Sequence, residues 1–247
     1  MAGRRTAQRR VGLRGWTGVL ALLSLLLLAP IIWVAHLTAA PNLIQLGTAS
    51  AARHKLAVIF FSGDTGQRSW SLGGRVAQQL AADGYPVTGI DALAAFSRRK
   101  TPSEVSELVQ RAIEIASAGS PDGRVVLIGQ SFGSDMIPLA VRGLPPELRR
   151  RIAKIILIVP GTHGYLQVSP GEIAGTAAPD LDIRPLVSTL PRVPVTCIYG
   201  VEEQDTLCAT LGRAGAGVFG LPGGHALRRD TGRVLGIVRS ALAAAPS

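Results

Sequence analysis

Six short apolar runs recur along the chain from residue 57 onwards, and segments with helical periodicity separate them. The runs consist mainly of Val, Ile, Leu and Phe and lack the polar alternation of a half-exposed strand. They are Ala57–Phe61, Val87–Ile90, Val125–Ile128, Ile155–Val159, Val195–Tyr199 and Val218–Leu221. Strands of this kind are buried on both faces, so the pattern predicts a parallel sheet covered by helices.

The segments between the runs predict the helices Leu72–Ala82, Ser103–Ala118, Ser134–Arg142 and Ala226–Ala244. Strands and helices that alternate with right-handed crossovers form a doubly wound, mostly parallel α/β sheet. The fold predicted for residues 56–247 is therefore one α/β domain of this type. A Gly- and Pro-rich connection over residues 161–185 is long enough to form a functional rim or lid.

The N-terminal pattern is different. No Asp, Glu, Lys or Arg occurs from Trp16 to Leu37, and five Arg precede this run. As a helix the run is about 33 Å long, which is enough to cross a bilayer, and the Arg residues keep the N-terminus in the cytoplasm. We expect a basic cytoplasmic segment at 1–15, a transmembrane signal anchor at 16–38 and a linker at 39–55, with the domain exported. Small residues at 38–40 also allow the alternative of a cleaved signal peptide.

The amino-acid composition limits the classes of partner and cofactor that are expected. The chain has 26 Lys and Arg against 16 Asp and Glu, a net charge of +10, and without the five N-terminal Arg the remainder carries +5. These basic residues are scattered and aromatics make up only 4%, so a nucleic-acid partner is not expected. Two Cys and four separated His do not form a familiar metal site, and we expect no metal or other cofactor.

The sequence Gly129-Gln130-Ser131-Phe132-Gly133 follows a buried strand and opens a helix. G-x-S-x-G in this setting is typical of a nucleophile elbow, whose sharp turn leaves room only for small residues two positions either side of the Ser. Ser131 is therefore the predicted nucleophile. The backbone N–H of Phe132, at the helix N-terminus, is a predicted oxyanion donor.

His225 is the predicted base, because it follows the last strand and precedes the last helix, where an α/β-hydrolase carries its catalytic His. His163 follows an earlier strand at the same sheet edge. It is the alternative base or a residue of the site rim.

The catalytic acid should follow the fifth apolar run. Asp205 is the first choice there, and Glu202 and Glu203 remain alternatives. Cys197 and Cys208 flank this loop, and in an oxidising compartment a disulfide between them would hold the acid in place; two buried free thiols are the alternative.

The second oxyanion donor should come from the loop after the first apolar run. The backbone N–H groups of Asp64 and Thr65 are the candidates, and the alternative is a plain turn. The carboxylates of Asp64 and Asp135 are also candidates for substrate binding beside the pocket, unless they are only helix-start residues.

From about Leu56 onwards these motifs resemble the AcvB/VirJ family of bacterial periplasmic proteins. The segments that carry the resemblance are Gly63-Asp64-Thr65-Gly66 with Trp70, Gly129–Asp135, Ile198–Cys208 and Pro222-Gly223-Gly224-His225. The resemblance implies an α/β-hydrolase, a lysyl-phosphatidylglycerol hydrolase among its activities, and links to type IV secretion and virulence.

Together these observations predict a membrane-tethered serine hydrolase with an exported domain. The resemblance further implies the inner membrane as its location, the periplasm as the compartment of the domain, and the aminoacyl ester of lysyl-phosphatidylglycerol as its substrate. Its basic surplus would favour an anionic lipid surface. Trp70 and His163 join Asp64 and Asp135 as predicted substrate-binding residues. The competing hypothesis is a non-catalytic accessory protein of a secretion system, with secretion-system proteins as partners, on the same scaffold.

Overall fold

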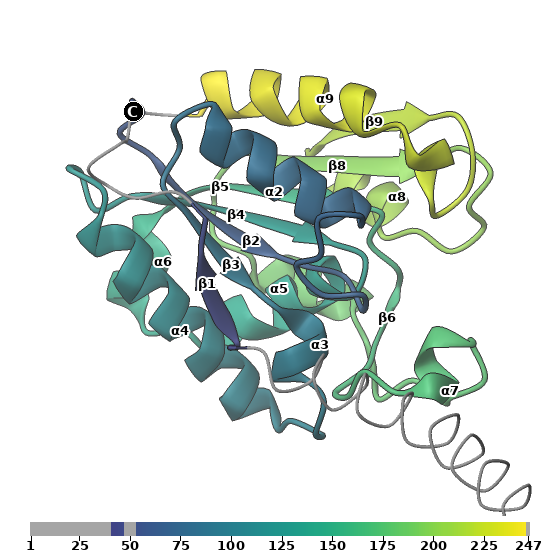
Figure 1. Cartoon of the computed structure of the whole chain (residues 1–247). Helices are drawn as coiled ribbons and strands as arrows, with labels where there is room; N and C mark the ends of the chain where they lie inside the picture. Colours follow the sequence, from purple (N-terminus) through teal and green to yellow (C-terminus); the bar gives the residue numbers. More distant parts are fainter. Residues whose placement is uncertain (1–40, 47–52, 246–247) are drawn as a thin grey trace, which may run out of the picture. The chain divides into compact units, whose positions relative to one another are not determined.

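A seven-stranded sheet forms the centre of the computed structural model, which describes residues 41–46 and 53–245 (Figure 1). Its strand order is β1-β3-β2-β4-β5-β8-β9, and every neighbouring pair except β1–β3 is parallel. The strands are β1 Leu43–Gln45, β2 Ala57–Phe61, β3 Val87–Ile90, β4 Val125–Gln130, β5 Ile152–Ile158, β8 Val195–Gly200 and β9 Gly217–Leu221. The predicted doubly wound, mostly parallel α/β sheet is confirmed.

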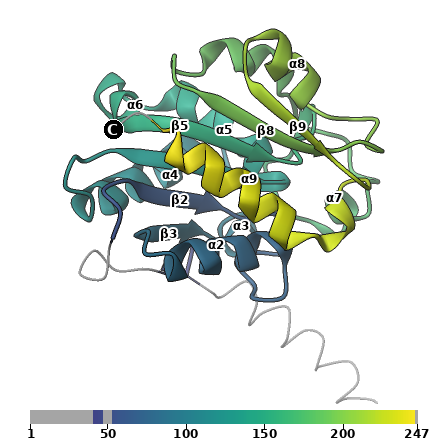
Figure 2. The ribbon, with the colours of Figure 1, turned by 90° about the horizontal axis from the view of Figure 1, so that it is seen from above.

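Helices cover both faces of the sheet. Figures 1 and 2 show α2 (Leu72–Ala82) and α9 (Thr231–Ala243) together on one face, and α4 (Pro102–Ala118) and α5 (Phe132–Gly143) on the other. The central strands are apolar on both sides, so Phe60 and Ile128 join the core under α2 and α9 while their neighbours join the core under α4 and α5. The short helices α3 Ala92–Ala95, α6 Pro146–Arg151 and α8 Cys208–Arg213 complete the domain.

Three helix starts differ from the predicted ones. Helix α5 begins at Phe132, two residues before the predicted Ser134, directly after the turn at Ser131. Helix α4 begins at Pro102, one residue early, because Thr101 and Glu104 form a reciprocal capping box ahead of it. Helix α9 begins at Thr231 rather than Ala226, because a left-handed 3-10 turn, η3 (Leu227–Arg229), precedes it.

Part of the predicted linker at 39–55 belongs to the sheet. Residues of β1 pair antiparallel with β3, with Ile44 opposite Gly89, and the N–H of Asp91 donates to the carbonyl of Asn42. A three-residue edge strand is too short to show a period-2 pattern, so the sequence carries no signal for it. The correction makes β1 the single antiparallel strand of this sheet.

The connection at 161–185 forms a small substructure at the carboxyl edge of the sheet. Strands β6 (His163–Gly164) and β7 (Leu181–Asp182) pair antiparallel, the single-turn helix α7 (Pro170–Ile173) lies between them, and η2 (Arg184–Thr189) follows. The Asp180 carboxylate accepts from the Leu166 N–H at 2.8 Å and pairs with Arg99, which attaches this segment to the domain.

The predicted cytoplasmic segment at 1–15 and signal anchor at 16–38 lie outside the described residues. Within residues 41–46 and 53–245, no helix has the length and apolarity needed to span a bilayer.

Candidate active site

Ser131 occupies a strained turn between β4 and α5. Its φ of 52° is in the left-handed region, which a residue other than Gly rarely adopts. The glycines on either side have no room for a side chain. A Cβ on Gly129 would lie 2.6 Å from Ser134 Cα, and a Cβ on Gly133 would lie 2.3 Å from the Phe61 carbonyl oxygen. The turn thus has the geometry of a nucleophile elbow.

Three side chains form a hydrogen-bonded chain at this elbow. Ser131 Oγ lies 2.7 Å from His225 Nε2, and His225 Nδ1 lies 2.8 Å from Glu203 Oε1. The His225 side chain is 56% exposed, whereas that of Glu203 is only 7% exposed. This is the arrangement of nucleophile, base and buried orienting acid.

The structure corrects the predicted acid from Asp205 to Glu203. The Asp205 carboxylate accepts hydrogen bonds from the N–H and hydroxyl of Thr162 and lies 3.6 Å from His163 Nδ1, so it faces the 161–185 segment instead of His225. Glu202 forms an exposed ion pair with Arg228 at 3.3 Å. Of the three acids that the sequence left as candidates, only Glu203 is hydrogen-bonded to His225.

The turn after β8 explains this choice. The N–H of Glu203 donates to the Gly200 carbonyl at 2.9 Å, and its Oε2 accepts from the Gly200 N–H at 2.7 Å. The carboxylate therefore folds back over the strand end, beside the loop that carries His225. A Cβ on Gly200 would lie 2.3 Å from the Gly224 carbonyl oxygen, so a glycine is needed for the two loops to meet.

A disulfide joins Cys197 on β8 to Cys208 at the start of α8, with a Cα–Cα distance of 5.5 Å. It spans the loop that carries Glu203. Both Cys residues are buried, so the bridge holds the two ends of the acid loop within the core.

Three backbone N–H groups near Ser131 are candidate oxyanion donors. In the described part of the chain, the N–H groups of Phe132, Asp64 and Thr65 donate to no protein acceptor. Phe132 is the first residue of α5, where helix geometry leaves its N–H unpaired. Asp64 and Thr65 line the same cavity as Ser131, and Phe132 directly follows Ser131 in the chain.

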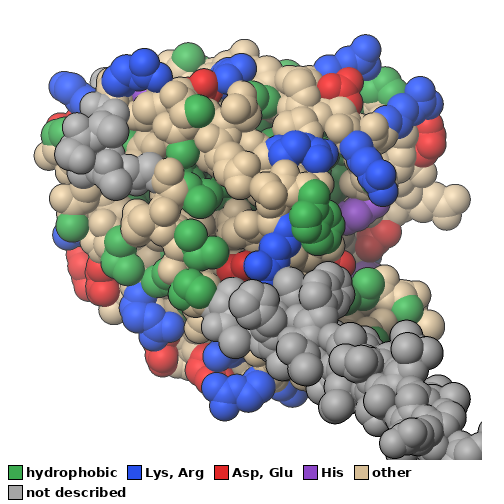
Figure 3. All heavy atoms as spheres, viewed as in Figure 1, with side chains coloured by type: hydrophobic (Ala, Val, Ile, Leu, Met, Phe, Trp, Pro, Cys, Tyr) green, Lys and Arg blue, Asp and Glu red, His purple; other side chains and the backbone are tan. Residues whose placement is uncertain are grey.

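The cavity that contains Ser131 and His225 has a volume of about 430 Å³. Asp64, Thr65 and the 62% exposed Trp70 line it, together with two cations that the sequence analysis did not single out, Arg75 and Arg229. Figure 3 shows Lys or Arg side chains beside a hydrophobic group and a histidine near the start of α2. Arg75 and Arg229 come from elements distant in sequence, and no motif connects them.

Neither Asp135 nor His163 lines this cavity. Asp135 lies one turn after Ser131, with its Oδ1 2.8 Å from the Gly161 nitrogen. Burial raises the pKa of Asp135 well above its ordinary value; the Gly161 hydrogen bond opposes this, and the carboxylates of Asp205, Glu172 and Glu203 add to it. Asp135 is thus a partly buried carboxyl group that contacts Gly161 of the 161–185 segment.

Glu172 on α7 belongs to the same cluster of carboxyl groups and extends it towards the cavity that contains Ser131. Burial and the neighbouring Asp64 carboxylate raise its pKa to about 7. Glu172 thus lies within electrostatic reach of both Asp64 at the cavity and Asp135 beside Gly161.

Comparisons with known proteins give the family and the fold. Residues 55–245 match the family described as bacterial virulence protein (VirJ). No curated protein sequence matches the chain significantly.

Similar solved structures include a lipase-esterase related protein from Clostridium acetobutylicum, at 14% identity and a TM-score of 0.57, covering 80% of this chain and 98% of that one. A thioesterase domain from the curacin biosynthetic pathway has 14% identity and a TM-score of 0.54, with 80% and 94% covered. An esterase domain from a Rhodothermus marinus protein has 14% identity and a TM-score of 0.54, with 81% and 96% covered. The shared fold is that of α/β-hydrolases.

Proposed function

Because the chain belongs to the VirJ family of bacterial virulence proteins and has the α/β-hydrolase fold, we propose that it is a serine hydrolase that cleaves a carboxylic ester. The observation that carries this proposal is the chain from Ser131 through His225 to Glu203, with spacings of 2.7 and 2.8 Å. A non-catalytic scaffold would not require these three groups in register.

In the proposed reaction Ser131 Oγ attacks the ester carbonyl carbon while His225 Nε2 takes the Ser proton. Glu203 holds the Nδ1 proton and stabilises the imidazolium. The N–H groups of Phe132 and of Asp64 or Thr65 donate to the oxyanion; such a donor lowers the barrier by about 2.7–4 kcal/mol. His225 then protonates the leaving alcohol, and water, activated by His225, releases the acid and regenerates Ser131.

The substrate that we propose is the aminoacyl ester of lysyl-phosphatidylglycerol. The cavity supports this by its charges: Arg75 and Arg229 suit the lipid phosphate, and the Asp64 carboxylate suits the lysyl ammonium. The apolar run at 16–37 and its Arg-rich flank favour a membrane-tethered periplasmic enzyme, which would meet this lipid at the bilayer surface.

Labelling by a fluorophosphonate probe tests the hydrolase proposal. The wild type should react, and Ser131→Ala should neither label nor hydrolyse any ester while keeping its unfolding temperature. Ser188→Ala, which removes a surface hydroxyl on η2, is the matched control and should label normally. Labelling of Ser131→Ala, or ester turnover by it, would contradict the serine mechanism.

Activity on lipid in vesicles tests the substrate separately. Arg229→Gln should raise KM for lysyl-phosphatidylglycerol at least tenfold and leave a short neutral ester unaffected, whereas Arg213→Gln on α8 should change neither. Asp64→Asn should slow lysyl esters more than alanyl esters. Equal effects on all esters would remove the lysyl assignment and leave the hydrolase proposal intact.

A further inference from the structure

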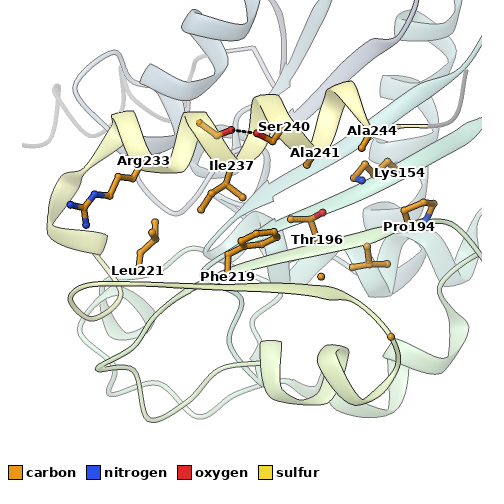
Figure 4. A pocket seen from close by; sticks show the side chains of 14 residues that line it. Lys154, Pro194, Thr196, Phe219, Leu221, Arg233, Ile237, Ser240, Ala241 and Ala244 are labelled. Carbon is orange, nitrogen blue, oxygen red and sulfur yellow. Dashed lines mark hydrogen bonds between the residues drawn. The ribbon is translucent and has the colours of Figure 1, made fainter.

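A second cavity, of about 670 Å³, lies between α9 and the β8–β9 half of the sheet (Figure 4). It shares no lining residue with the cavity of Ser131. Its walls are mainly apolar: Phe219 and Leu221 come from β9, Ile237 and Ala241 from α9, and Thr196 from β8.

This second cavity, called the groove from here on, exists because α9 does not fill the space above β8 and β9. The helix packs against α2 and β5, and the stripe it turns towards β9 includes the small residues Gly236, Ser240 and Ala244. Phe219 faces the α9 side of the sheet, in register with Ile198, yet remains 44% exposed. An aromatic side chain is thus open to solvent on a face that a helix would otherwise cover.

Lys154 on β5 lies at one end of this groove, beneath Ala244 (Figure 4). Lys154 is only 5% exposed. Its side-chain ammonium forms no hydrogen bond or ion pair with any of the described residues. Burial lowers the pKa of the Lys154 ammonium. Arg233, at the opposite end, pairs instead with Asp230 at 3.2 Å.

We propose that this groove binds a single-chain fatty-acid carboxylate, with the carboxylate on Lys154 and the alkyl chain along Thr196, Phe219 and Ile237. The stretch of α9 from Arg233 to Ala244 is about 16 Å long, which suits one extended alkyl chain. The site is independent of the ester hydrolysis proposed at Ser131.

Charge complementarity selects this occupant. A neutral alkyl chain or the apolar face of a second copy would cover Phe219 but leave the Lys154 ammonium buried without an anion, which is unfavourable. A carboxylate supplies the missing counter-charge and hydrogen-bond acceptor, while its chain covers the exposed aromatic.

Calorimetric titration of the protein with decanoate, and with decyltrimethylammonium as the cation of matched chain, tests the proposal. Decanoate should bind at least tenfold more tightly than the cation. Lys154→Met and Phe219→Ser should each weaken decanoate at least tenfold, whereas Lys154→Arg should retain binding. Trp70→Ala, in the Ser131 cavity, should not affect it.

Gly236→Leu provides a test that does not depend on removing a buried residue. A Cβ on Gly236 meets nothing within 4 Å, so Leu should fold normally, fill the groove and abolish decanoate binding. Unchanged decanoate affinity in Lys154→Met or Gly236→Leu would overturn the proposal. Loss of decanoate binding in Trp70→Ala would also overturn the proposal. The same holds if the protein binds no decanoate and instead forms a dimer that the Phe219→Ser substitution dissociates.

Discussion

Glu203 is held through both of its carboxylate oxygens. Oε2 accepts from the Gly200 N–H and Oε1 faces His225 Nδ1, and the side chain is almost fully buried. A carboxylate in this position favours the imidazole tautomer with the proton on Nδ1, which leaves Nε2 free to accept the proton of Ser131. The identity of the acid can be tested directly because Asp205, two residues later, is a natural control.

Glu203→Gln should lower kcat for a short ester by about 10⁴-fold with little change in KM, because the amide no longer stabilises the imidazolium. The Gln carbonyl can still accept from Gly200, so the loop should remain folded. Asp205→Asn should retain kcat within severalfold. Steady-state kinetics on both variants tests which acid orients His225. A larger loss of kcat in Asp205→Asn than in Glu203→Gln would assign this role to Asp205.

Glu172 should make stability depend on pH near neutrality. Its folded pKa of about 7 lies above the ordinary 4.5, so the native state favours the protonated form. The resulting stabilisation is complete below about pH 4.5 and is lost as the pH rises through 7. For this half-buried group we expect a change of about 1 kcal/mol in the free energy of unfolding.

Urea unfolding at pH 5 to 8 measures this effect. Glu172→Gln should remove the pH dependence that Glu172 contributes to the free energy of unfolding. The contribution of Asp135 should persist in both proteins. Glu147→Gln, at an exposed site on α6, is the control and should follow the wild-type curve. Parallel curves for wild type and Glu172→Gln would contradict the expectation.

At the scale of elements, the loop between β8 and α8 is closed by the Cys197–Cys208 disulfide. A bridge across 11 residues contributes about 3 kcal/mol in the chain-entropy account. The double Cys→Ala variant should lose about this much stability. It should also lose activity at temperatures where it remains folded, because the loop that positions Glu203 is freed.

Denaturant unfolding and kcat at 20 °C distinguish these two effects. Wild type treated with reductant should behave like the double variant. Full kcat in a folded protein without the disulfide would show that the Gly200 contacts alone hold the acid.

The approach of the β8 and β9 loops depends on Gly200. Gly200→Ala should force the loops apart, destabilising the protein by about 1–3 kcal/mol and separating Glu203 from His225. Gly236→Ala, on an open face of α9, is the matched control and should stabilise by about 0.5–1 kcal/mol. Thermal unfolding with kcat measurements checks both, and equal behaviour of the two variants would contradict the steric argument.

At the scale of the whole molecule, the positive charge should govern access to lipid. The chain carries +5 beyond its Arg-rich start. Hydrolysis of lipid esters in anionic vesicles should therefore fall several-fold between about 50 and 500 mM salt, because screening weakens attraction to the surface. Turnover of a soluble neutral ester should stay constant. An equal decline for both substrates would indicate an effect on the site itself.

Several features of this protein are determined by short stretches of its sequence. Strands β2 and β3 and helix α2 have the predicted bounds, because a strand buried on both faces is apolar throughout and an amphipathic helix has its own period. The elbow is equally local. Its strained turn requires small residues within two positions of Ser131, and both glycines lie inside the motif.

Other features were decided by the tertiary structure. Glu202, Glu203 and Asp205 have similar chemistry, and the turn at Gly200 determines which one meets His225 on the next loop. Strand β1 exists because β3 offers an edge to a segment too short to show a pattern. Arg75 and Arg229 share a cavity because α2 and α9 pack side by side on one face of the sheet, and packing across the chain leaves no local trace in sequence.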